Sequence, residues 1–294
     1  MSRIDLHLTR CLQLFGCDCP FSEARYAVVG VPLDLTATYR PGARFGPRAV
    51  REASLSLESF CPRSGLDIND LKICDLGDLR TVGSIDKTLG MLEGVVAEIV
   101  SEGKLPVLIG GEHTLTISAV KALKKKPMVL CFDAHMDFRD EFLGVRFSHA
   151  TVMRRVAQLV GVDRVVEVGV RAFSRDEYDY ARRAGLRVVS SRDVVKMGVS
   201  RVSRSLSRIV GSDGVYVSID MDVLDPCYAP AVGNPEPEGL SPTTLLEIIA
   251  MLSKLPVVGL DVVEVAPIYD TGQTAIQAAH TVGEVLCLLE RQLR

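Results

Sequence analysis

The sequence predicts an α/β fold built around one mostly parallel sheet. Short runs rich in Val, Ile and Leu recur along the chain, and most are continuously apolar, which is typical of strands that are covered on both faces. Longer amphipathic segments separate these runs and are long enough to form helices. The two kinds of segment alternate to the end of the sequence, as they do in α/β domains.

We expect eight strands, each formed by one of the short apolar runs. They are predicted over residues 26–31, 72–75, 106–109, 128–132, 164–168, 187–190, 215–219 and 257–263. The sequence contains no evident linker, repeat or low-complexity stretch. We therefore expect residues 1–294 to form a single domain around a single sheet.

Two helices are predicted between strands in the first half of the sequence. Residues 85–101 carry apolar side chains at helical spacing, and Gly103 is suited to end that helix. Another helix is expected over residues 114–125, where the lysines near its end would complement the helix dipole. Pro127 follows directly, so this helix should end before it.

A third helix is predicted over residues 241–255, because Ser241 suits the N-cap position and the proline after it suits the first helical position. The preceding Pro- and Gly-rich segment, residues 225–242, is expected to be a stiff loop that follows a strand. Loops of this length in compact domains usually have a function.

The composition is that of an ordinary globular protein. Charged residues make up 24% of the 294 residues and the net charge is −3, so there is no electrostatic indication of nucleic-acid binding. The N-terminus lacks the apolar segment of an export signal, and no apolar run approaches the roughly 20 residues needed to span a bilayer. We expect a cytoplasmic protein.

The eight cysteines are too few for a disulfide scaffold in a chain of this length. Cys131 lies in a predicted buried strand, where a cysteine is usually an inert apolar residue. The cluster of Cys11, Cys17 and Cys19 is suited to metal binding or to a disulfide, but unpaired thiols are the interpretation we favour. A low content of Asn and Gln is a trend of thermophile proteins, in which intracellular disulfides do occur.

Three polar motifs lie at the carboxyl ends of predicted strands, at residues 110–113, 133–137 and 218–222. Open α/β sheets bind ligands beyond the carboxyl ends of their strands. Within the motifs the polar residues are spaced by two, which places side chains on one face of an extended backbone. The candidate metal ligands are His113, Asp133, His135, Asp137, Asp220 and Asp222.

Two imidazoles and four carboxylates form a hard, oxygen-rich ligand set that is too large for one tetrahedral zinc and suits a pair of divalent ions such as Mn²⁺. A lone His-x-Asp is more often a capped turn or a surface pair. Four aspartates beside apolar runs, however, cannot be buried without partners. Because two bound divalent ions activate water near neutral pH, the motifs predict a two-metal hydrolase.

Two further residues are candidates for the chemistry. His149 lies in the loop after the second motif and is placed to act as a proton shuttle, although a loop histidine is often an exposed residue without a role. Glu264 follows the last predicted strand, where its carboxylate can hold a cation. The alternative for Glu264 is a strand-end charge paired with an arginine.

The chain resembles the ureohydrolases of the arginase/agmatinase family over nearly its whole length. The motifs that carry the resemblance are Tyr-Arg-Pro-Gly-Ala-Arg-Phe-Gly-Pro (39–47), Gly-Gly-Glu-His-Thr (110–114), Asp-Ala-His-Met-Asp (133–137), Ser-His-Ala-Thr (148–151), Ser-Ile-Asp-Met-Asp-Val-Leu-Asp-Pro (218–226) and Asp-Val-Val-Glu-Val-Ala-Pro (261–267). Together and in this order they are highly specific.

The resemblance implies a three-layer α/β/α fold with an eight-stranded, mainly parallel sheet, and a homotrimer or homohexamer. It implies two Mn²⁺ ions, one held by His113, Asp133, Asp137 and Asp220 and the other by His135, Asp133, Asp220 and Asp222. Glu264 matches the glutamate that holds the guanidinium group, and His149 matches the proton-shuttle histidine.

Agmatine, cleaved to putrescine and urea, is the expected substrate. Residues 143–149 lack the Asn that is typical of arginases, and residues 137–142 and 233–241 look more like agmatinases. The acidic residues Asp140 and Glu141 beside the second motif would disfavour a substrate carboxylate. Arginine, guanidinobutyrate and aminopropylagmatine remain alternative substrates.

Two other classes of protein remain as alternatives. A metal-binding relative without hydrolase activity would be expected to lack the glutamate or the histidine, and both are present. A deacetylase of related fold keeps one zinc and lacks the full set of six ligands, so the metal content distinguishes it from a dimanganese enzyme.

Overall fold

The computed structural model describes residues 2–210 and 214–293. Within these residues a central sheet of nine strands has the order β1-β5-β2-β6-β11-β10-β7-β8-β9. Every neighbouring pair is parallel except β1 with β5. The strands are β1 (Leu8–Thr9), β2 (Tyr26–Val31), β5 (Ile73–Leu79), β6 (Leu105–Gly110), β7 (Met128–Phe132), β8 (Val165–Val170), β9 (Arg187–Ser190), β10 (Val215–Asp220) and β11 (Val257–Val263).

All eight strands predicted from the sequence are present, and the predicted α/β fold with a mainly parallel sheet is confirmed. The expected count of eight is wrong by one, because β1 adds a ninth strand that pairs antiparallel with β5 at the sheet edge. Two residues are too few to show a periodic pattern in a sequence. The same reason explains why the separate hairpin of β3 (Phe60–Cys61) and β4 (Leu66–Asp67) was not predicted.

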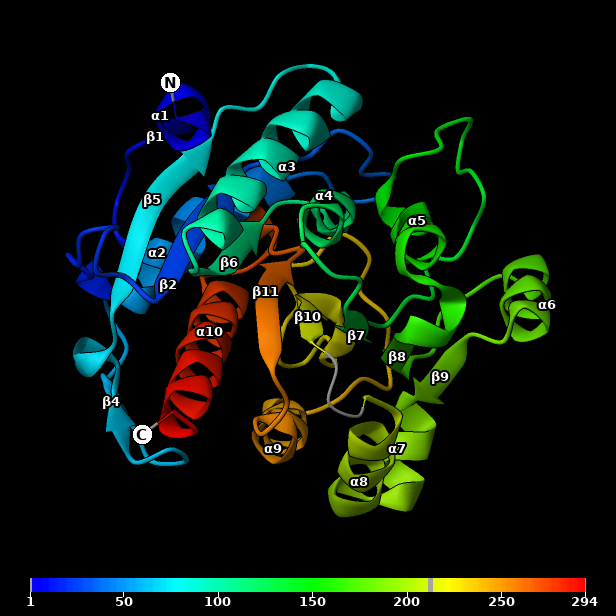
Figure 1. The fold of residues 1–294 in the computed structure, drawn as a ribbon. Helices are drawn as coiled ribbons and strands as arrows, with labels where there is room; N and C mark the ends of the chain where they lie inside the picture. Colours follow the sequence, from blue (N-terminus) through cyan, green and yellow to red (C-terminus); the bar gives the residue numbers. More distant parts are fainter. Residues whose placement is uncertain (1, 211–213, 294) are drawn as a thin grey trace.

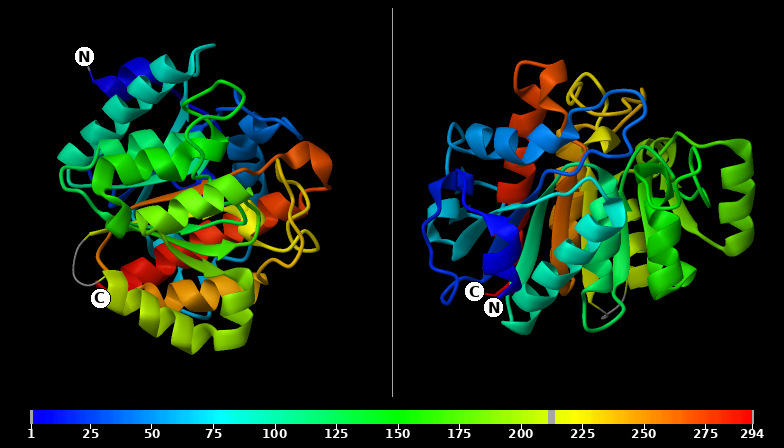
Figure 2. Two further views of the ribbon diagram at one scale, coloured as in Figure 1. Left: turned by 90° about the vertical axis from the view of Figure 1, so that its right-hand side faces the viewer. Right: turned by 90° about the horizontal axis from the view of Figure 1, so that it is seen from above.

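Helices cover both faces of the sheet. In Figure 1, α3, α4 and α5 lie above the strands and α9 and α10 lie below them, and the right-hand view of Figure 2 shows β11, in orange, in the middle of the sheet. The helices are α1 (Arg3–His7), α2 (Gly46–Ser54), α3 (Ile85–Ser101), α4 (Thr116–Lys121), α5 (Val152–Val160), α6 (Arg175–Ala184), α7 (Ser191–Met197), α8 (Val199–Val210), α9 (Pro242–Leu252) and α10 (Gln273–Arg291).

The two helical layers explain why the strands are continuously apolar. Successive residues of a strand point to opposite faces of the sheet. In β2, Val28 belongs to the core cluster that includes Leu286 of α10, whereas Val29 belongs to the cluster that includes Leu92 of α3. Since each face is buried against helices, every position in the strand must be apolar.

The predicted helix over 85–101 coincides with α3, and Gly103 adopts a positive φ of 72° just beyond its end. The helix predicted over 241–255 is α9, which is slightly shorter, and the Ser241 hydroxyl accepts a hydrogen bond from the Thr244 N–H. The helix predicted over 114–125 is wrong at both ends: a 3₁₀ turn precedes α4, and α4 ends at Lys121. The lysines at 124–126 therefore lie beyond the helix, where their mutual repulsion and the following proline disfavour another turn.

A buried ion pair joins α2 to the sheet. The guanidinium of Arg51, which is fully buried, donates to both carboxylate oxygens of Asp75 at 2.7 and 2.9 Å and to Asp78 at 2.6 Å. Charge-assisted, two-point contacts of this kind fix orientation as well as distance. The pair holds α2, and the loop that leads into it from β2, against β5.

Neither a membrane span nor a disulfide is found in the part of the chain described here. No helix within it is both long enough and apolar enough to cross a membrane. All eight cysteines are free thiols. The favoured interpretation of Cys11, Cys17 and Cys19 as unpaired agrees with this arrangement.

Candidate metal centre

The strand order brings the three polar motifs to the middle of one sheet edge. His113 follows β6, Asp133 follows β7, and Asp220 ends β10. Glu264 follows β11, and these four strands are consecutive neighbours in the order β6-β11-β10-β7. The loops that carry the motifs therefore start side by side at the carboxyl edge of the sheet, where α/β proteins bind ligands.

The first group of predicted ligands surrounds the Nδ1 atom of His113. This nitrogen lies 3.0 Å from Asp133 Oδ2, 3.3 Å from Asp220 Oδ2 and 3.5 Å from Asp137 Oδ2. It is buried and makes no hydrogen bond. One imidazole nitrogen facing three carboxylates is a ready donor set for a divalent cation.

The second group is centred on His135. Its Nδ1 atom lies 2.9 Å from Asp222 Oδ2 and 3.6 Å from Asp133 Oδ1. Asp133 thus presents one carboxylate oxygen to His113 and the other to His135. All six predicted ligands come together, in two groups that share Asp133.

Turns, rather than extended backbone, bring the residues spaced by two onto one side. Asp133 Oδ1 accepts a hydrogen bond from the His135 N–H at 2.6 Å, and Asp220 Oδ1 accepts one from the Asp222 N–H at 2.9 Å. Each aspartate therefore folds the chain back directly after its strand. Asp137 adopts a positive φ of 47°. The residues spaced by two do lie on one side, as predicted. The reason is a turn after each strand, and not the extended backbone that the sequence suggested.

A hydroxyl and a carboxylate set the orientation of the His113 ring. Its Nε2 atom lies 2.9 Å from the Ser218 hydroxyl, and that hydroxyl donates its single proton to Asp261 at 2.6 Å. Because Asp261 only accepts, Ser218 must accept from the Nε2–H of the imidazole. In the neutral ring that a metal ligand needs, Nδ1 is then the unprotonated nitrogen that faces the three aspartates. Without a cation, the facing aspartates outweigh burial and raise the pKa of His113 well above its ordinary value, so a metal would have to displace a proton from Nδ1.

The electrostatics of the group favour bound cations. Burial and the charge of Asp133 raise the pKa of Asp137 to about 7, and burial with the charge of Asp222 raises the pKa of Asp220 well above its ordinary value. Carboxylates so close together repel one another when they ionise. Two divalent cations would compensate four carboxylate charges, so the residues fit a metal pair.

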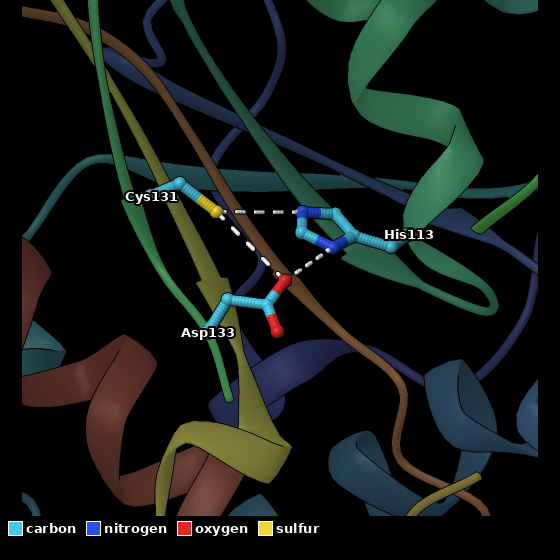
Figure 3. A group of neighbouring side chains, drawn as sticks. All are labelled: His113, Cys131 and Asp133. Carbon is cyan, nitrogen blue, oxygen red and sulfur yellow. Dashed lines mark hydrogen bonds and ion pairs between the residues drawn. The ribbon is translucent and has the colours of Figure 1, made fainter. Parts of the chain in front are cut away.

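Cys131 is a neighbour of the site that the sequence did not indicate. Its thiol lies 3.8 Å from Nε2 of His113 and 4.0 Å from Oδ2 of Asp133 (Figure 3). Burial raises the pKa of the thiol well above its ordinary value, so it stays protonated and is a poor ligand. Cys131 lies on β7 two residues before Asp133, which directly follows the strand, and this spacing was the signal that the two side chains share a face.

His149 lies at a cavity of about 320 Å³ whose lining includes His135, Asp137, Arg139 and Glu236. Burial, together with the charges of His135 and His113, lowers the pKa of His149 to about 4. The ring is therefore neutral near pH 7, the state in which it can accept a proton. Its predicted position close to the metal motifs, without being among the ligands, is found in the structure.

Glu264 contacts the backbone of the first predicted ligand, His113. Its Oε1 atom accepts a hydrogen bond from the His113 N–H at 2.8 Å, while a Cβ atom at Gly233 would lie 3.1 Å from its Oε2. Burial raises the pKa of the Glu264 carboxyl to about 8, so a cationic group bound beside it would favour the ionised form. The backbone has a positive φ of 64° there, a strained conformation that often accompanies function.

Comparisons with known proteins agree with this fold and site. A model of the arginase family matches residues 24–288, and the chain belongs to that family. The chain is 37% identical to an agmatinase of Bacillus subtilis, covering 90% of this chain and 92% of the relative, and 39% identical to the human mitochondrial guanidino acid hydrolase, covering 90% and 78%. The structure of agmatine ureohydrolase from Thermoplasma volcanium superposes with a TM-score of 0.88 at 38% identity, covering 93% of this chain and 92% of that one.

The chain is therefore an enzyme, an agmatinase-like ureohydrolase, and the resemblance noted in the sequence is confirmed. The match to the arginase family argues against a deacetylase of related fold. The family's dependence on a pair of metal ions agrees with the group of His and Asp side chains at the strand ends.

Proposed function

We propose that the protein is a dimanganese agmatinase that hydrolyses agmatine to putrescine and urea. The observation that carries the choice of substrate is the charge balance around the cavity. Arg139 lies 3.4 Å from the buried Glu177, so these two charges compensate each other. Glu236 also lines the cavity, and its carboxylate lies 3.8 Å from Nε2 of His135. With His135 neutral as a metal ligand, Glu236 supplies the negative charge that a distal ammonium of agmatine would meet.

This argument replaces the role expected for Asp140. The carboxylate of Asp140 lies 2.6 Å from Arg155 and 3.3 Å from Arg154, so two arginines compensate it. Neither Asp140 nor the exposed Glu141 is among the residues that line the cavity. Asp140 therefore holds its loop against α5 instead of selecting the substrate.

The proposed roles follow the geometry. One Mn²⁺ is held by His113, Asp133, Asp137 and Asp220 and the other by His135, Asp133, Asp220 and Asp222, with support from the two groups of contacts around the histidines. The metal pair, when bound, activates water and stabilises developing negative charge. Glu264 pairs with the guanidinium in a charge-assisted contact, and His149 transfers a proton to the leaving amine.

We also propose that residues 1–294 form one ureohydrolase domain, and that the enzyme assembles as a homotrimer or homohexamer. The shared central sheet, with each strand hydrogen-bonded to its neighbours, supports a single domain. The measurement for the assembly is light scattering coupled to size-exclusion chromatography, in which a monomer would contradict the proposal.

A guanidino acid such as 4-guanidinobutyrate is the second candidate substrate. Arg139 lines the cavity, and 37% of its side chain is exposed, so it can reach a distal carboxylate if it leaves Glu177. The relatives of the chain include a guanidinobutyrase of Pseudomonas aeruginosa, at 34% identity. This candidate requires Arg139 to leave Glu177, whereas the distal ammonium of agmatine does not need that change.

The test is to measure urea release by the Mn²⁺-loaded enzyme from agmatine, arginine, 4-guanidinobutyrate and aminopropylagmatine under one buffer. We expect agmatine to have the highest kcat/KM. Glu236→Gln should lower kcat/KM for agmatine by roughly two- to fivefold, the scale of a partly exposed charge pair, while Glu141→Gln serves as the matched control. Faster turnover of arginine or 4-guanidinobutyrate would refute agmatine as substrate and leave the ureohydrolase class intact.

A further inference from the structure

The loop that follows β2 brings a threonine against the proton-shuttle candidate. The hydroxyl oxygen of Thr36 lies 3.0 Å from Nδ1 of His149 and also accepts a hydrogen bond from the His149 backbone N–H at 3.2 Å. The same hydroxyl lies 2.9 Å from Oε1 of Glu112. One side chain thus touches the ring and the backbone of His149 and a buried carboxylate.

Glu112 is held as an acceptor of hydrogen bonds. Its Oε2 atom accepts the backbone N–H groups of Leu35 at 2.6 Å and Thr36 at 2.8 Å. Its Oε1 atom accepts the hydroxyls of Thr36 at 2.9 Å and Thr114 at 2.6 Å. Glu112 is 1% exposed, so its carboxylate depends on these four bonds rather than on bulk water. The proton of the Thr36 hydroxyl is therefore directed to Glu112.

This direction determines the tautomer of His149. A threonine hydroxyl has one proton to donate and two lone pairs that accept. The proton goes to Glu112, and one lone pair accepts the His149 backbone N–H. The remaining lone pair can accept only from an Nδ1–H of the imidazole ring. The ring is consequently protonated at Nδ1, and Nε2 is left with its lone pair.

We infer that Thr36, held by Glu112, is a positioning residue that fixes His149 in the Nδ1–H tautomer and presents Nε2 to the substrate. This inference rests on the proposed role of His149. Phe142 meets the ring edge-on, with centroids 5.9 Å apart and planes at 87°, so the ring is bounded on that side as well. In this tautomer Nε2 can accept the proton that the attacking water loses and return it to the leaving nitrogen, which restores the neutral ring.

The direct test is the tautomer itself. Long-range ¹H–¹⁵N spectra of the full-length protein, metal-free and with diamagnetic Mg²⁺, distinguish Nδ1–H from Nε2–H imidazoles, and His149→Gln assigns the signal among five histidines. We expect an Nδ1–H ring in the wild type and in Thr36→Ser, and an Nε2–H ring or a mixture in Thr36→Val. An Nε2–H ring in the wild-type protein would overturn the inference, even where Thr36→Val fails to fold.

Kinetics of the Mn²⁺-loaded enzyme give the second readout. Thr36→Val should lower kcat by about tenfold or more, because it disturbs, without removing, a general acid–base group of the kind that contributes ~10²–10⁴-fold, with KM and the thermal midpoint little changed. Thr36→Ser, which keeps the hydroxyl, should restore kcat to within about threefold. Wild-type kcat in Thr36→Val would refute the positioning role. If no guanidino substrate is turned over, the proposed function fails, whereas the spectra still decide the tautomer.

Discussion

Replacement of Glu264 by Gln tests the guanidinium contact most sharply, because the structure predicts how the new amide will orient. The Oε1 atom of Glu264 accepts the His113 N–H at 2.8 Å. A glutamine has one acceptor oxygen, and keeping this buried hydrogen bond requires that oxygen to stay at the Oε1 position. The amide NH₂ then occupies the Oε2 position, so a donor faces the donors of the guanidinium.

The magnitude follows from the bonds that are lost. A hydrogen bond to a charged group contributes about 1.5–3 kcal/mol, and a donor turned toward another donor is left unsatisfied as well. A total of about 3 kcal/mol corresponds to a loss of roughly 10²-fold in kcat/KM. Because the guanidinium is charged before the reaction begins, much of the loss should appear as a higher KM.

The assay is urea release by Glu264→Gln and by Glu141→Gln, an exposed control that makes the same chemical change. Both proteins should carry the wild-type amount of metal, measured by elemental analysis, because Glu264 is outside the proposed ligand set. A Glu264→Gln enzyme with full metal content and a kcat/KM within about threefold of the wild type would show that this carboxylate does not hold the substrate.

Four other changes have defined outcomes. His149→Ala should lower kcat by about 10²–10⁴-fold with metal content unchanged, and wild-type kcat would remove His149 from the mechanism. Asp133→Ala should lose more metal than His113→Ala, because Asp133 contacts both histidines. Equal losses of metal in elemental analysis would argue against Asp133 as a ligand that both ions share. Affinity for Mn²⁺ should fall as the pH decreases from 8 to 6. Asp137 has a pKa of about 7 and binds a proton over that range, which the metal must displace. A constant affinity measured by calorimetry would contradict this expectation. Arg51→Met should destabilise the fold by about 3–5 kcal/mol in urea unfolding, because it leaves buried carboxylates unpaired, and a change below about 1 kcal/mol would contradict the buried pair.

The sequence predicts the strands and the ligands for a shared physical reason. A strand buried on both faces must be apolar throughout, so a sudden change to His and Asp marks the point where the chain leaves the core. This holds after β6, β7 and β10, where His113, Asp133 and Asp220 stand. The same contrast cannot detect β1, whose two residues pair at the edge of the sheet, or the early end of α4.

Long-range pairing is the part that the sequence pattern does not contain. The insertion of β11 between β6 and β10 places Glu264 beside His113, although the two are 151 positions apart. Charge compensation has the same origin. Asp140 looked like a free acid beside the second motif, but Arg154 and Arg155, near the start of α5, pair with it. Only the folded structure distinguishes an acidic side chain that can contact the substrate from one that is already paired with arginines.

The two histidines differ in tautomer, and hydroxyls from distant elements decide the difference. Ser218, 105 positions from His113, accepts a hydrogen bond from Nε2 and donates one to Asp261, which leaves Nδ1 as the nitrogen that would bind a cation. Thr36, 113 positions from His149, acts in the same way on Nδ1, which leaves Nε2 free for a proton. In each case a hydroxyl with one proton and a carboxylate with none force the imidazole to donate. The same chemical unit, placed on opposite ring nitrogens, prepares one histidine to bind metal and the other to transfer protons.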